Sequence, residues 1–264
     1  MGNALIGYSG FVGSTLLRQA SFDSLYRSTN IGDVEGQSFD TVVCAGTSAT
    51  KWIANRDPEA DWQKVAALIT HLKTLRCSTF ILISTVDVFK DPTGVDENSL
   101  VDESGLHAYG LHRRSLEKFV NSQFPNSMIV RLPGLVGPGL RKNIIFDLLN
   151  SKNLEAIESR AVFQFYPMVN LWYDIQMALD AGLKLVHLTA QPISVAEVSK
   201  KGFGKIFDRV LPNDPPRYAM QTVHAQVFGC NGRYQYTARE TIQAIRAYAQ
   251  SEPLTTESEL EVKS

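Results

Sequence analysis

The sequence predicts an α/β fold built on a doubly wound parallel sheet with helices on both faces. Short apolar runs alternate with helical patterns through the first half of the 264-residue chain. Runs such as Thr41–Ala45 and Phe80–Ile83 are apolar throughout, which is typical of strands covered on both faces. A glycine-rich turn near the amino terminus joins the first apolar run directly to a helical pattern. Together these observations indicate strand–helix units with right-handed crossovers.

The glycine-rich turn follows the pattern Gly7-x-x-Gly10-x-x-Gly13, with Phe11 and Val12 at the start of the helix. Gly7 lets the strand turn sharply, Gly10 lets a pyrophosphate approach the backbone, and Gly13 lets the helix pack closely on the strand. Free N–H groups at the helix start then face the phosphates. Ordinary tight turns also contain glycine triplets, but the flanking strand and helix favour a Rossmann-type dinucleotide site formed by these five residues.

The other elements of the first half follow the same alternation. We expect helices over Phe11–Ala20, Glu59–Leu75 and Gly105–Asn121, and strands near Ala4–Tyr8, Ser24–Arg27, Thr41–Ala45, Phe80–Ser84 and Ser127–Leu132. Residues 28–40 are too few for a helix and a further strand, so the first half of the sheet should be abbreviated.

The second half has a different texture. We expect helical segments at Asn143–Asn150 and Leu171–Ala181, a strand at Lys184–Leu188, a helix capped by Ser194, and a last helix from Thr237 to about Ala249. We therefore divide the chain into a dinucleotide-binding domain, a small substrate-binding part and a disordered tail, at residues 1–133, 134–250 and 251–264. The strand near 184–188 should return to the first domain, so the two parts interleave.

The composition is that of an ordinary globular protein, with 44% hydrophobic and 20% charged residues and a formal net charge of −1. This balance gives no reason to expect a nucleic acid or an anionic membrane as partner. No apolar segment approaches the roughly 20 residues that span a bilayer. The three cysteines are isolated, so we expect reduced thiols in a cytoplasmic protein. No metal is expected, because no cluster of His, Cys, Asp or Glu has metal-ligand spacing.

The candidate catalytic residues are Thr85, Tyr109 and Arg113. Thr85 stands at the carboxyl end of a buried strand, where ligands of open α/β sheets bind. Tyr109 and Arg113 are four residues apart in a helical pattern and share one face. A nearby guanidinium lowers the pKa of a phenol, which can then exchange a proton with a carbonyl or alcohol oxygen held by Thr85. The ordinary alternative is a packed phenol beside a solvated cation.

In these motifs the chain resembles the extended short-chain dehydrogenase/reductases, a family that includes nucleotide-sugar epimerases, dehydratases and reductases. The glycine turn, Ser84-Thr85 ahead of Val88-Phe89, and Tyr109-x-x-x-Arg113 match in order and spacing. The segment Arg131–Pro138 is similar to the family's Arg-x-x-Asn-Val-Tyr-Gly-Pro, and weaker similarity continues to about residue 200.

The resemblance implies an NAD(P)-dependent enzyme that transfers hydride to or from a nucleotide-sugar-like substrate. It implies that Tyr109 is the acid/base, that Thr85 is its hydroxyl partner and that residue 113 contacts the nicotinamide ribose. Leu132 and Pro133 would pass beside the nicotinamide. Family members often pair through the helix that carries the tyrosine, so a homodimer is possible.

Three positions depart from the family pattern. Arg113 replaces a lysine, and its forked guanidinium alters both the ribose contact and proton relay. Gly134 replaces the asparagine, and we include it among the substrate-binding positions. Val86-Asp87 replaces the Asp-Glu pair of the dehydratases, which leaves reduction, oxidation or epimerisation. These departures also favour an alternative, a catalytically weak dinucleotide-binding sensor or partner protein.

The choice between NADP and NAD depends on the residues after the second strand. No carboxylate precedes Asp33 there, whereas Arg27 and Asn30 can hold a 2′-phosphate, so NADP is favoured over NAD. Asp33 and Val34 should lie near the adenine. Ala45 and Gly46, at the end of the third strand, complete the expected cofactor site.

The substrate side of the site is less clearly marked. Arg217, His224 and Arg233 are candidates, because arginine forks suit a pyrophosphate, although surface positions are the plain alternative. We expect His71, His107, His112 and His187 on the surface, and most tryptophans in the core or an interface.

Overall fold

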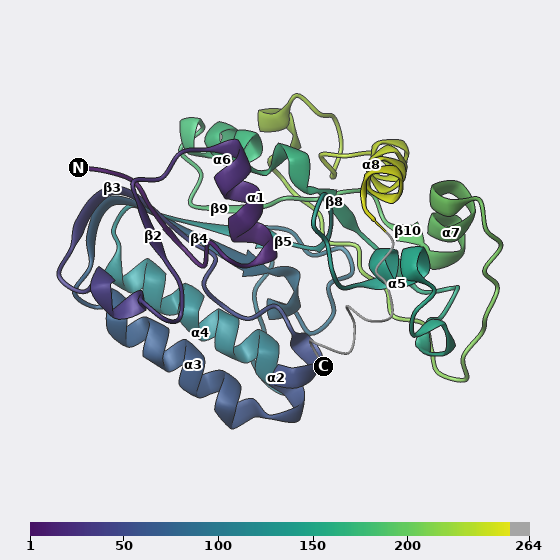
Figure 1. The fold of residues 1–264 in the computed structure, drawn as a ribbon, viewed down its shortest axis with the longest axis horizontal. Coiled ribbons are helices and arrows are strands. Elements are labelled where there is room, and N and C mark those ends of the chain that lie inside the picture. Colours follow the sequence, from purple (N-terminus) through teal and green to yellow (C-terminus); the bar gives the residue numbers. More distant parts are fainter. Residues whose placement is uncertain (254–264) are drawn as a thin grey trace.

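The computed structural model describes residues 1–253, and its centre is a six-stranded sheet in which all neighbouring strands are parallel (Figure 1). The strand order is β2-β1-β3-β4-β5-β9, so the winding reverses between β1 and β3. The fold class predicted from the sequence is confirmed. The strands are β1 (Ala4–Ile6), β2 (Ser24–Tyr26), β3 (Ser38–Cys44), β4 (Arg76–Thr85), β5 (Ser127–Leu132) and β9 (Leu185–His187).

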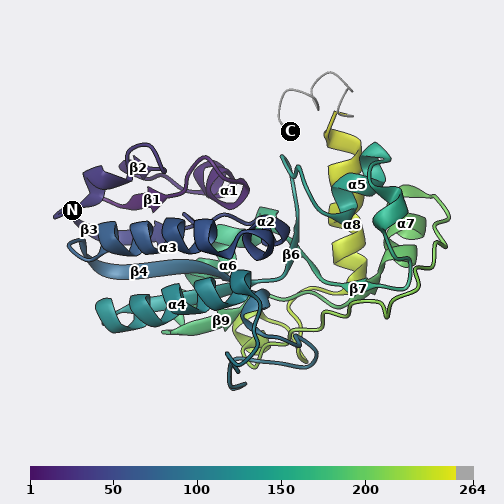
Figure 2. The ribbon, with the colours of Figure 1, turned by 90° about the horizontal axis from the view of Figure 1, so that it is seen from below.

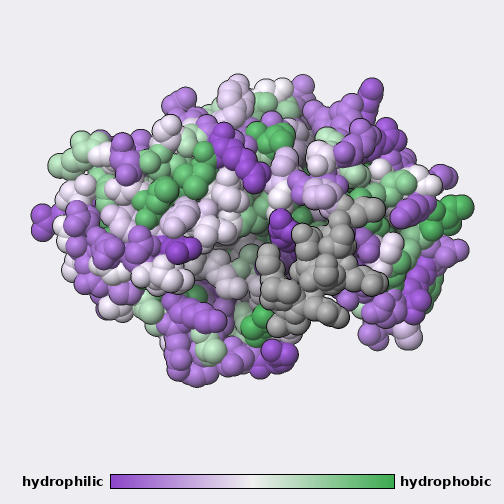
Figure 3. Space-filling model, viewed as in Figure 1, coloured by the Kyte–Doolittle hydropathy of each residue, from purple (hydrophilic) through white to green (hydrophobic). Residues whose placement is uncertain are grey.

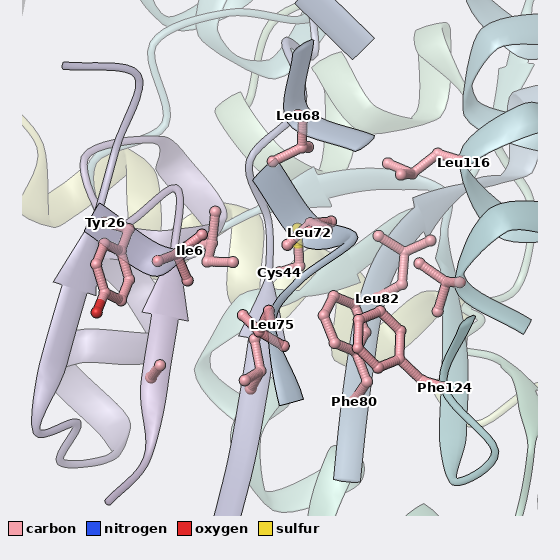
Figure 4. Close-up of a cluster of buried hydrophobic side chains, with 14 of the residues drawn as sticks. Ile6, Tyr26, Cys44, Leu68, Leu72, Leu75, Phe80, Leu82, Leu116 and Phe124 are labelled. Carbon is pink, nitrogen blue, oxygen red and sulfur yellow. The ribbon is translucent and has the colours of Figure 1, made fainter. Parts of the chain in front are cut away.

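Helices cover both faces of this sheet, which explains why its strands are apolar throughout. On one face lie α3 (Pro58–Leu72) and α4 (Ala108–Gln123), and on the other lie α1 (Phe11–Gln19) and α6 (Leu171–Asp180) (Figure 1). Alternate residues of β4 enter different apolar clusters, with Phe80 and Leu82 against α3 and α4, and Ile81 against α1 and α6. In the first cluster the rings of Phe80 and Phe124 stack 4.2 Å apart (Figure 4).

The first half of the sheet is abbreviated, as the sequence predicts. A single turn of 3₁₀ helix, Ile31–Val34, connects β2 to β3, and β2 is the edge strand. In the first half of the chain, the helix α2 (Lys51–Arg56) between β3 and α3 was not predicted. It has six residues and too little apolar periodicity to be recognised from sequence.

Apart from α6 and β9, which belong to the sheet and its cover, the helices and strands after β5 form a separate cluster at one end of the sheet (Figure 2). A third apolar cluster holds together α5 (Ile144–Asn150), α7 (Val195–Phe203) and α8 (Ala238–Ser251). Two pairs of short strands, which the sequence did not predict, connect them: β6 (Gly134–Val136) with β8 (Phe165–Pro167), and β7 (Val162–Phe163) with β10 (Ile193–Ser194).

The helix cap predicted at Ser194 is present, and the last helix has a cap that was not predicted. Ser194 accepts a hydrogen bond from the Glu197 N–H at the start of α7, and Thr237 and Glu240 form a reciprocal capping box on α8. The predicted tail begins at 251, whereas α8 continues to Ser251, and residues 254–264 of that tail lie outside the described residues.

Apolar and hydrophilic residues are interspersed on the surface in Figure 3. Trp62 and Trp172 pack against the two sheet clusters, but Trp52 on α2 is 63% exposed, with the Arg56 guanidinium 4.9 Å from its ring centroid. Within residues 1–253, no helix has both the length and the apolar character needed to cross a bilayer.

Candidate active site

The glycine turn lies at the carboxyl ends of β1 and β3, where the winding of the sheet reverses. Gly7 has φ +85°, and a Cβ there would lie 2.3 Å from the Ala45 carbonyl oxygen. A Cβ on Gly13 would lie 2.1 Å from the Gly7 carbonyl oxygen. These two glycines therefore allow strand, turn and helix to approach as closely as they do.

Gly10 is different, because the side on which its Cβ would stand is open. The nearest heavy atom there is the Gly7 carbonyl oxygen at 3.5 Å. Gly10 is the N-cap of α1, which has no side-chain cap and no acidic residue in its first turn. Helix N–H groups with open space and no competing carboxylate suit a diphosphate, so this turn fits a dinucleotide.

The other residues predicted to bind the cofactor lie around this turn. Phe11 and Val12 begin α1, and Ala45 donates its N–H to the Ile6 carbonyl oxygen at 2.9 Å. Gly46 follows beside the Ile6 side chain. Leu132 ends β5 in register with Thr85, and Pro133 comes next.

The residues predicted to lie near the adenosine have unequal freedom. Arg27 is exposed, with its guanidinium 5.9 Å from the Tyr8 ring centroid and its Nε donating to Thr29 Oγ1 at 3.0 Å. Asn30 accepts the Arg27 N–H at 2.8 Å and donates to the Leu25 carbonyl oxygen at 3.0 Å, so its amide closes the turn. Val34 is buried in the core and Asp33 is exposed. Arg27 is thus the side chain best placed to reach a ligand.

Thr85 and Tyr109 are brought together where β4 ends and α4 begins. Thr85 accepts the backbone N–H of Asp87 at 3.1 Å, and its side chain lies close enough to the Tyr109 hydroxyl to act on the pKa of that phenol. The backbone of Tyr109 is tied to α2, because its N–H donates to Asn55 Oδ1 at 3.0 Å. A Cβ on Gly110 would lie 2.1 Å from the Asp87 carbonyl oxygen, so glycine lets α4 approach this turn.

Arg113 lies over the Tyr109 ring, 4.0 Å from its centroid, and is 3% exposed. Its two terminal nitrogens pair with the Asp61 carboxylate, and one of them also donates to the Ser48 carbonyl oxygen at 2.6 Å. The guanidinium therefore forms a buried ion pair in which both terminal nitrogens have protein partners. The plain alternative of a solvated cation is wrong.

Burial raises the pKa of Tyr109, and this outweighs the opposing effect of Arg113. The Thr85 hydrogen bond and the charge of Lys51 also act to lower the pKa of Tyr109, whereas Asp87 raises it. The predicted net lowering of the phenol pKa is therefore wrong, although Arg113 acts in the predicted direction.

Sequence reasoning missed a second set of polar side chains beside this pair. Lys51 Nζ lies 2.6 Å from Asp87 Oδ1 and 3.1 Å from the Tyr218 hydroxyl, which itself donates to Asp87 Oδ1 at 3.1 Å. Lys51 lies on the unpredicted helix α2. The sequence points to Arg217 as a substrate-binding residue rather than to its neighbour Tyr218. No local signal in the sequence links residues 51, 87 and 218.

The predicted substrate residues lie elsewhere. Arg217 is exposed, on the opposite side of an extended segment from Tyr218. The Arg233 side chain donates to Gln221 Oε1 at 2.6 Å, so it has a partner within its own segment. The backbone N–H of His224 donates to Thr222 Oγ1 at 3.1 Å. Gly134 begins β6 and pairs with Phe165.

A buried ionic cluster lies under the site and fixes its frame. Glu117 on α4 accepts from Arg131 on β5 and from Ser84 on β4 at 2.6–2.9 Å. Arg131 also meets Nε2 of His187, which is fully buried, so the predicted surface position of His187 is wrong. Burial lowers the pKa of His187 to about 4.

The other predicted surface histidines are also engaged. His107 caps α4 by accepting the Gly110 N–H at 3.0 Å, His112 pairs with Asp61 at 2.7 Å, and His71 pairs with Glu35 at 2.6 Å. Across residues 1–253, no group of three or more His, Cys, Asp or Glu side chains is placed to hold a metal ion.

Comparison with known proteins relates this geometry to nucleotide-sugar enzymes through structure alone. No family model matches the chain, and neither does any curated protein. RMD from Pseudomonas aeruginosa, solved with NADPH, superposes with a TM-score of 0.73 at 16% identity, covering 95% of this chain and 99% of that one.

Two further solved structures agree. A mutant UDP-glucuronic acid 4-epimerase from Bacillus cereus, solved with a UDP-sugar and NAD, gives a TM-score of 0.72 at 15% identity over 95% of this chain and 98% of that one. A dTDP-4-dehydrorhamnose reductase from Clostridium acetobutylicum gives 0.70 at 15% over 95% and 99%. The chain therefore has the fold expected from its resemblance to the extended short-chain dehydrogenase/reductases.

Proposed function

We propose that this protein is an NAD(P)-dependent oxidoreductase or epimerase that acts on a nucleotide-sugar-like substrate. The observation that carries the proposal is the proximity of Tyr109 and Thr85 at the carboxyl end of β4, beside a turn that fits a dinucleotide. The structurally similar enzymes solved with NADPH, NAD and UDP-sugars support it.

The glycine turn and the start of α1 would hold the diphosphate of the cofactor. The exposed Arg27 guanidinium would meet a 2′-phosphate, which favours NADP over NAD. Leu132 and Pro133 would flank the nicotinamide, because they continue the strand next to Thr85. A bound nicotinamide would supply the hydride chemistry.

The protein's own groups would handle the proton. Tyr109 would donate it to a carbonyl oxygen in reduction and take it from an alcohol in oxidation, while Thr85 orients that oxygen. Arg113 would favour the phenolate from its place over the ring, without a direct contact to ribose. Because Tyr109 is 7% exposed, water would be largely excluded from the phenol.

Water elimination is not part of the proposal. Residue 86 is a buried valine and has no carboxylate, and the Asp87 carboxylate is paired with Lys51 and accepts from Tyr218. Neither position therefore offers a free carboxylate for proton abstraction. Reduction, oxidation and epimerisation all need only the phenol and the cofactor.

A dinucleotide-binding sensor of low activity is the second candidate. The raised pKa of Tyr109 and the occupied terminal nitrogens of Arg113 favour it.

Calorimetry with NADPH, NADP⁺, NADH and NAD⁺ tests the shared premise, and the expected result is binding with preference for the phosphorylated forms. An Arg27→Ala variant should lose that preference, whereas Arg233→Ala should keep it. If none of the four nucleotides binds, both functions are excluded. If binding occurs but no nucleotide sugar in a panel changes the nicotinamide absorbance or is converted to its epimer, the sensor is supported.

A further inference from the structure

Lys51, Asp87 and Tyr218 form a compact cluster from three distant segments of the chain. Lys51 lies on α2, Asp87 in the turn after β4, and Tyr218 on the extended segment after residue 216. Each pair among the three is within hydrogen-bond distance, at 2.6–3.1 Å. The Asp87 carboxyl and the Lys51 side chain are 16% and 36% exposed, so the ion pair is only partly screened by solvent.

This cluster is continuous with the Tyr109–Thr85 pair. Asp87 Oδ2 lies 3.4 Å from Thr85 Oγ1, while Asp87 Oδ1 accepts from Lys51. The Asp87 backbone N–H also donates to Thr85 Oγ1 at 3.1 Å. The side chain of Asp87 therefore links the Lys51 ammonium to the Thr85 hydroxyl, which lies beside the Tyr109 phenol.

The charges around the phenol explain why this link matters. Tyr109 is faced by Arg113 from its own helix, by His107 at the N-cap, by Asp87 after β4 and by Lys51 on α2. Tyr218 lies behind Asp87, and burial favours its neutral form. Burial likewise favours neutral His107. Arg113 is matched by Asp61, so Lys51 is the cation that offsets the negative charge of Asp87.

We infer that Lys51 is a positioning residue for the Tyr109–Thr85 pair and acts through Asp87. Its ammonium fixes the Asp87 carboxylate against Thr85 and cancels a negative charge that would otherwise oppose the phenolate. Its importance for turnover rests on the proposed function, but its effect on the phenol does not. Asp87, which occupies a position where the dehydratases carry an acidic residue, is thus part of a structural ion pair.

The phenol itself provides the test. The protein is produced with 3-fluorotyrosine, whose phenol is more acidic than that of tyrosine, so that Tyr109 titrates while Lys51 is still protonated. The ¹⁹F resonance of residue 109 is assigned by its loss in Tyr109→Phe. In Lys51→Gln, the titration midpoint of residue 109 should rise by about one pH unit.

Three variants distinguish this charge effect from a general disturbance. Lys51→Arg should titrate close to the unsubstituted protein, and Lys51→Gln/Asp87→Asn should return most of the way to it. Lys142→Gln is the matched control, because Lys142 donates to Thr50, next to Lys51, without contacting Asp87. The ¹⁹F shifts of the other tyrosines report whether each variant is folded.

An unchanged midpoint in Lys51→Gln would overturn the inference, and so would an equal rise in the double variant. Should Lys51→Gln fail to fold, Asp87→Asn alone must lower the midpoint for the inference to survive. These titrations need neither cofactor nor substrate. A failure to bind nicotinamide nucleotides would therefore exclude the proposed function and leave the role of Lys51 to the titrations. In an active enzyme, Lys51→Gln should move the phenolate-dependent rise in oxidation rate to higher pH.

Discussion

The two sides of the candidate site are built by different means. On one side, close approach of backbone segments makes the site. Gly7, Gly13 and Gly110 allow this approach, because a Cβ at any of them would collide with a neighbouring carbonyl oxygen. On the other, charged side chains make it, through Arg113 with Asp61 and Lys51 with Asp87. The first side is marked in the sequence by the local spacing of Gly7, Gly10 and Gly13, whereas the charged pairs of the second side are about 35 to 50 residues apart. Local motifs therefore reveal the first and conceal the second.

The largest effect should come from the charged side. Asp61→Asn leaves the buried Arg113 guanidinium without its counter-charge, and breaking such a pair costs about 3–5 kcal/mol of folding free energy. Urea unfolding measures it. Asp40→Asn, in an exposed pair with the amino terminus, should change the free energy of unfolding by about 1 kcal/mol or less. Equal effects in the two variants would show that the Arg113 pair does not depend on burial.

A second prediction concerns the buried ionic cluster under the site. His187 has a folded pKa of about 4, below the ordinary value of about 6.5, so the unfolded chain takes up its proton first as pH falls. This contributes a loss of about 3 kcal/mol of stability between pH 6.5 and pH 4, on top of other titrating groups. In His187→Gln that part of the slope should vanish in urea unfolding measured over this range. A variant with the slope of the unsubstituted protein would contradict it.

The backbone side should give a smaller and more selective response. Gly13→Ala forces a Cβ against the Gly7 carbonyl oxygen, and such overpacking costs about 1–3 kcal/mol. In Gly10→Ala the new Cβ would lie 3.5 Å from the Gly7 carbonyl oxygen, so the free energy of unfolding should fall by about 1 kcal/mol or less. The added methyl group would nevertheless occupy the space proposed for a phosphate. Gly10→Ala should thus weaken NADPH binding at least tenfold in calorimetry while remaining folded. Stable Gly13→Ala with unchanged binding would refute the distinction.

The same contrast explains how far the sequence predicts this molecule. Local apolar runs, caps and glycine spacing predict the six strands of the sheet, the seven helices α1 and α3 to α8, and the Tyr109–Thr85 pair. The helix α2 has too few residues for a periodic signal, and so do the unpredicted strands β6, β7, β8 and β10. Their positions are decided by packing between distant segments.

Arg113 shows why a site residue can be located correctly and interpreted wrongly. Its spacing from Tyr109 places it on the right face of α4, and it does lie over the phenol. Its partners, Asp61 and the Ser48 carbonyl, come from other elements. The direction of the phenol pKa is decided by burial of Tyr109, which also depends on the folded chain. Lys51 and Tyr218 were missed for the same reason, since only the folded chain places them beside Asp87.

The most direct test of the account is hydride exchange between NADP(H) and a panel of nucleotide sugars, compared between the unsubstituted protein and Tyr109→Phe. The account predicts activity that falls by about 10²–10⁴-fold in the variant while NADPH binds with unchanged affinity. Undiminished activity in Tyr109→Phe would contradict it, because the proton would then pass through another group.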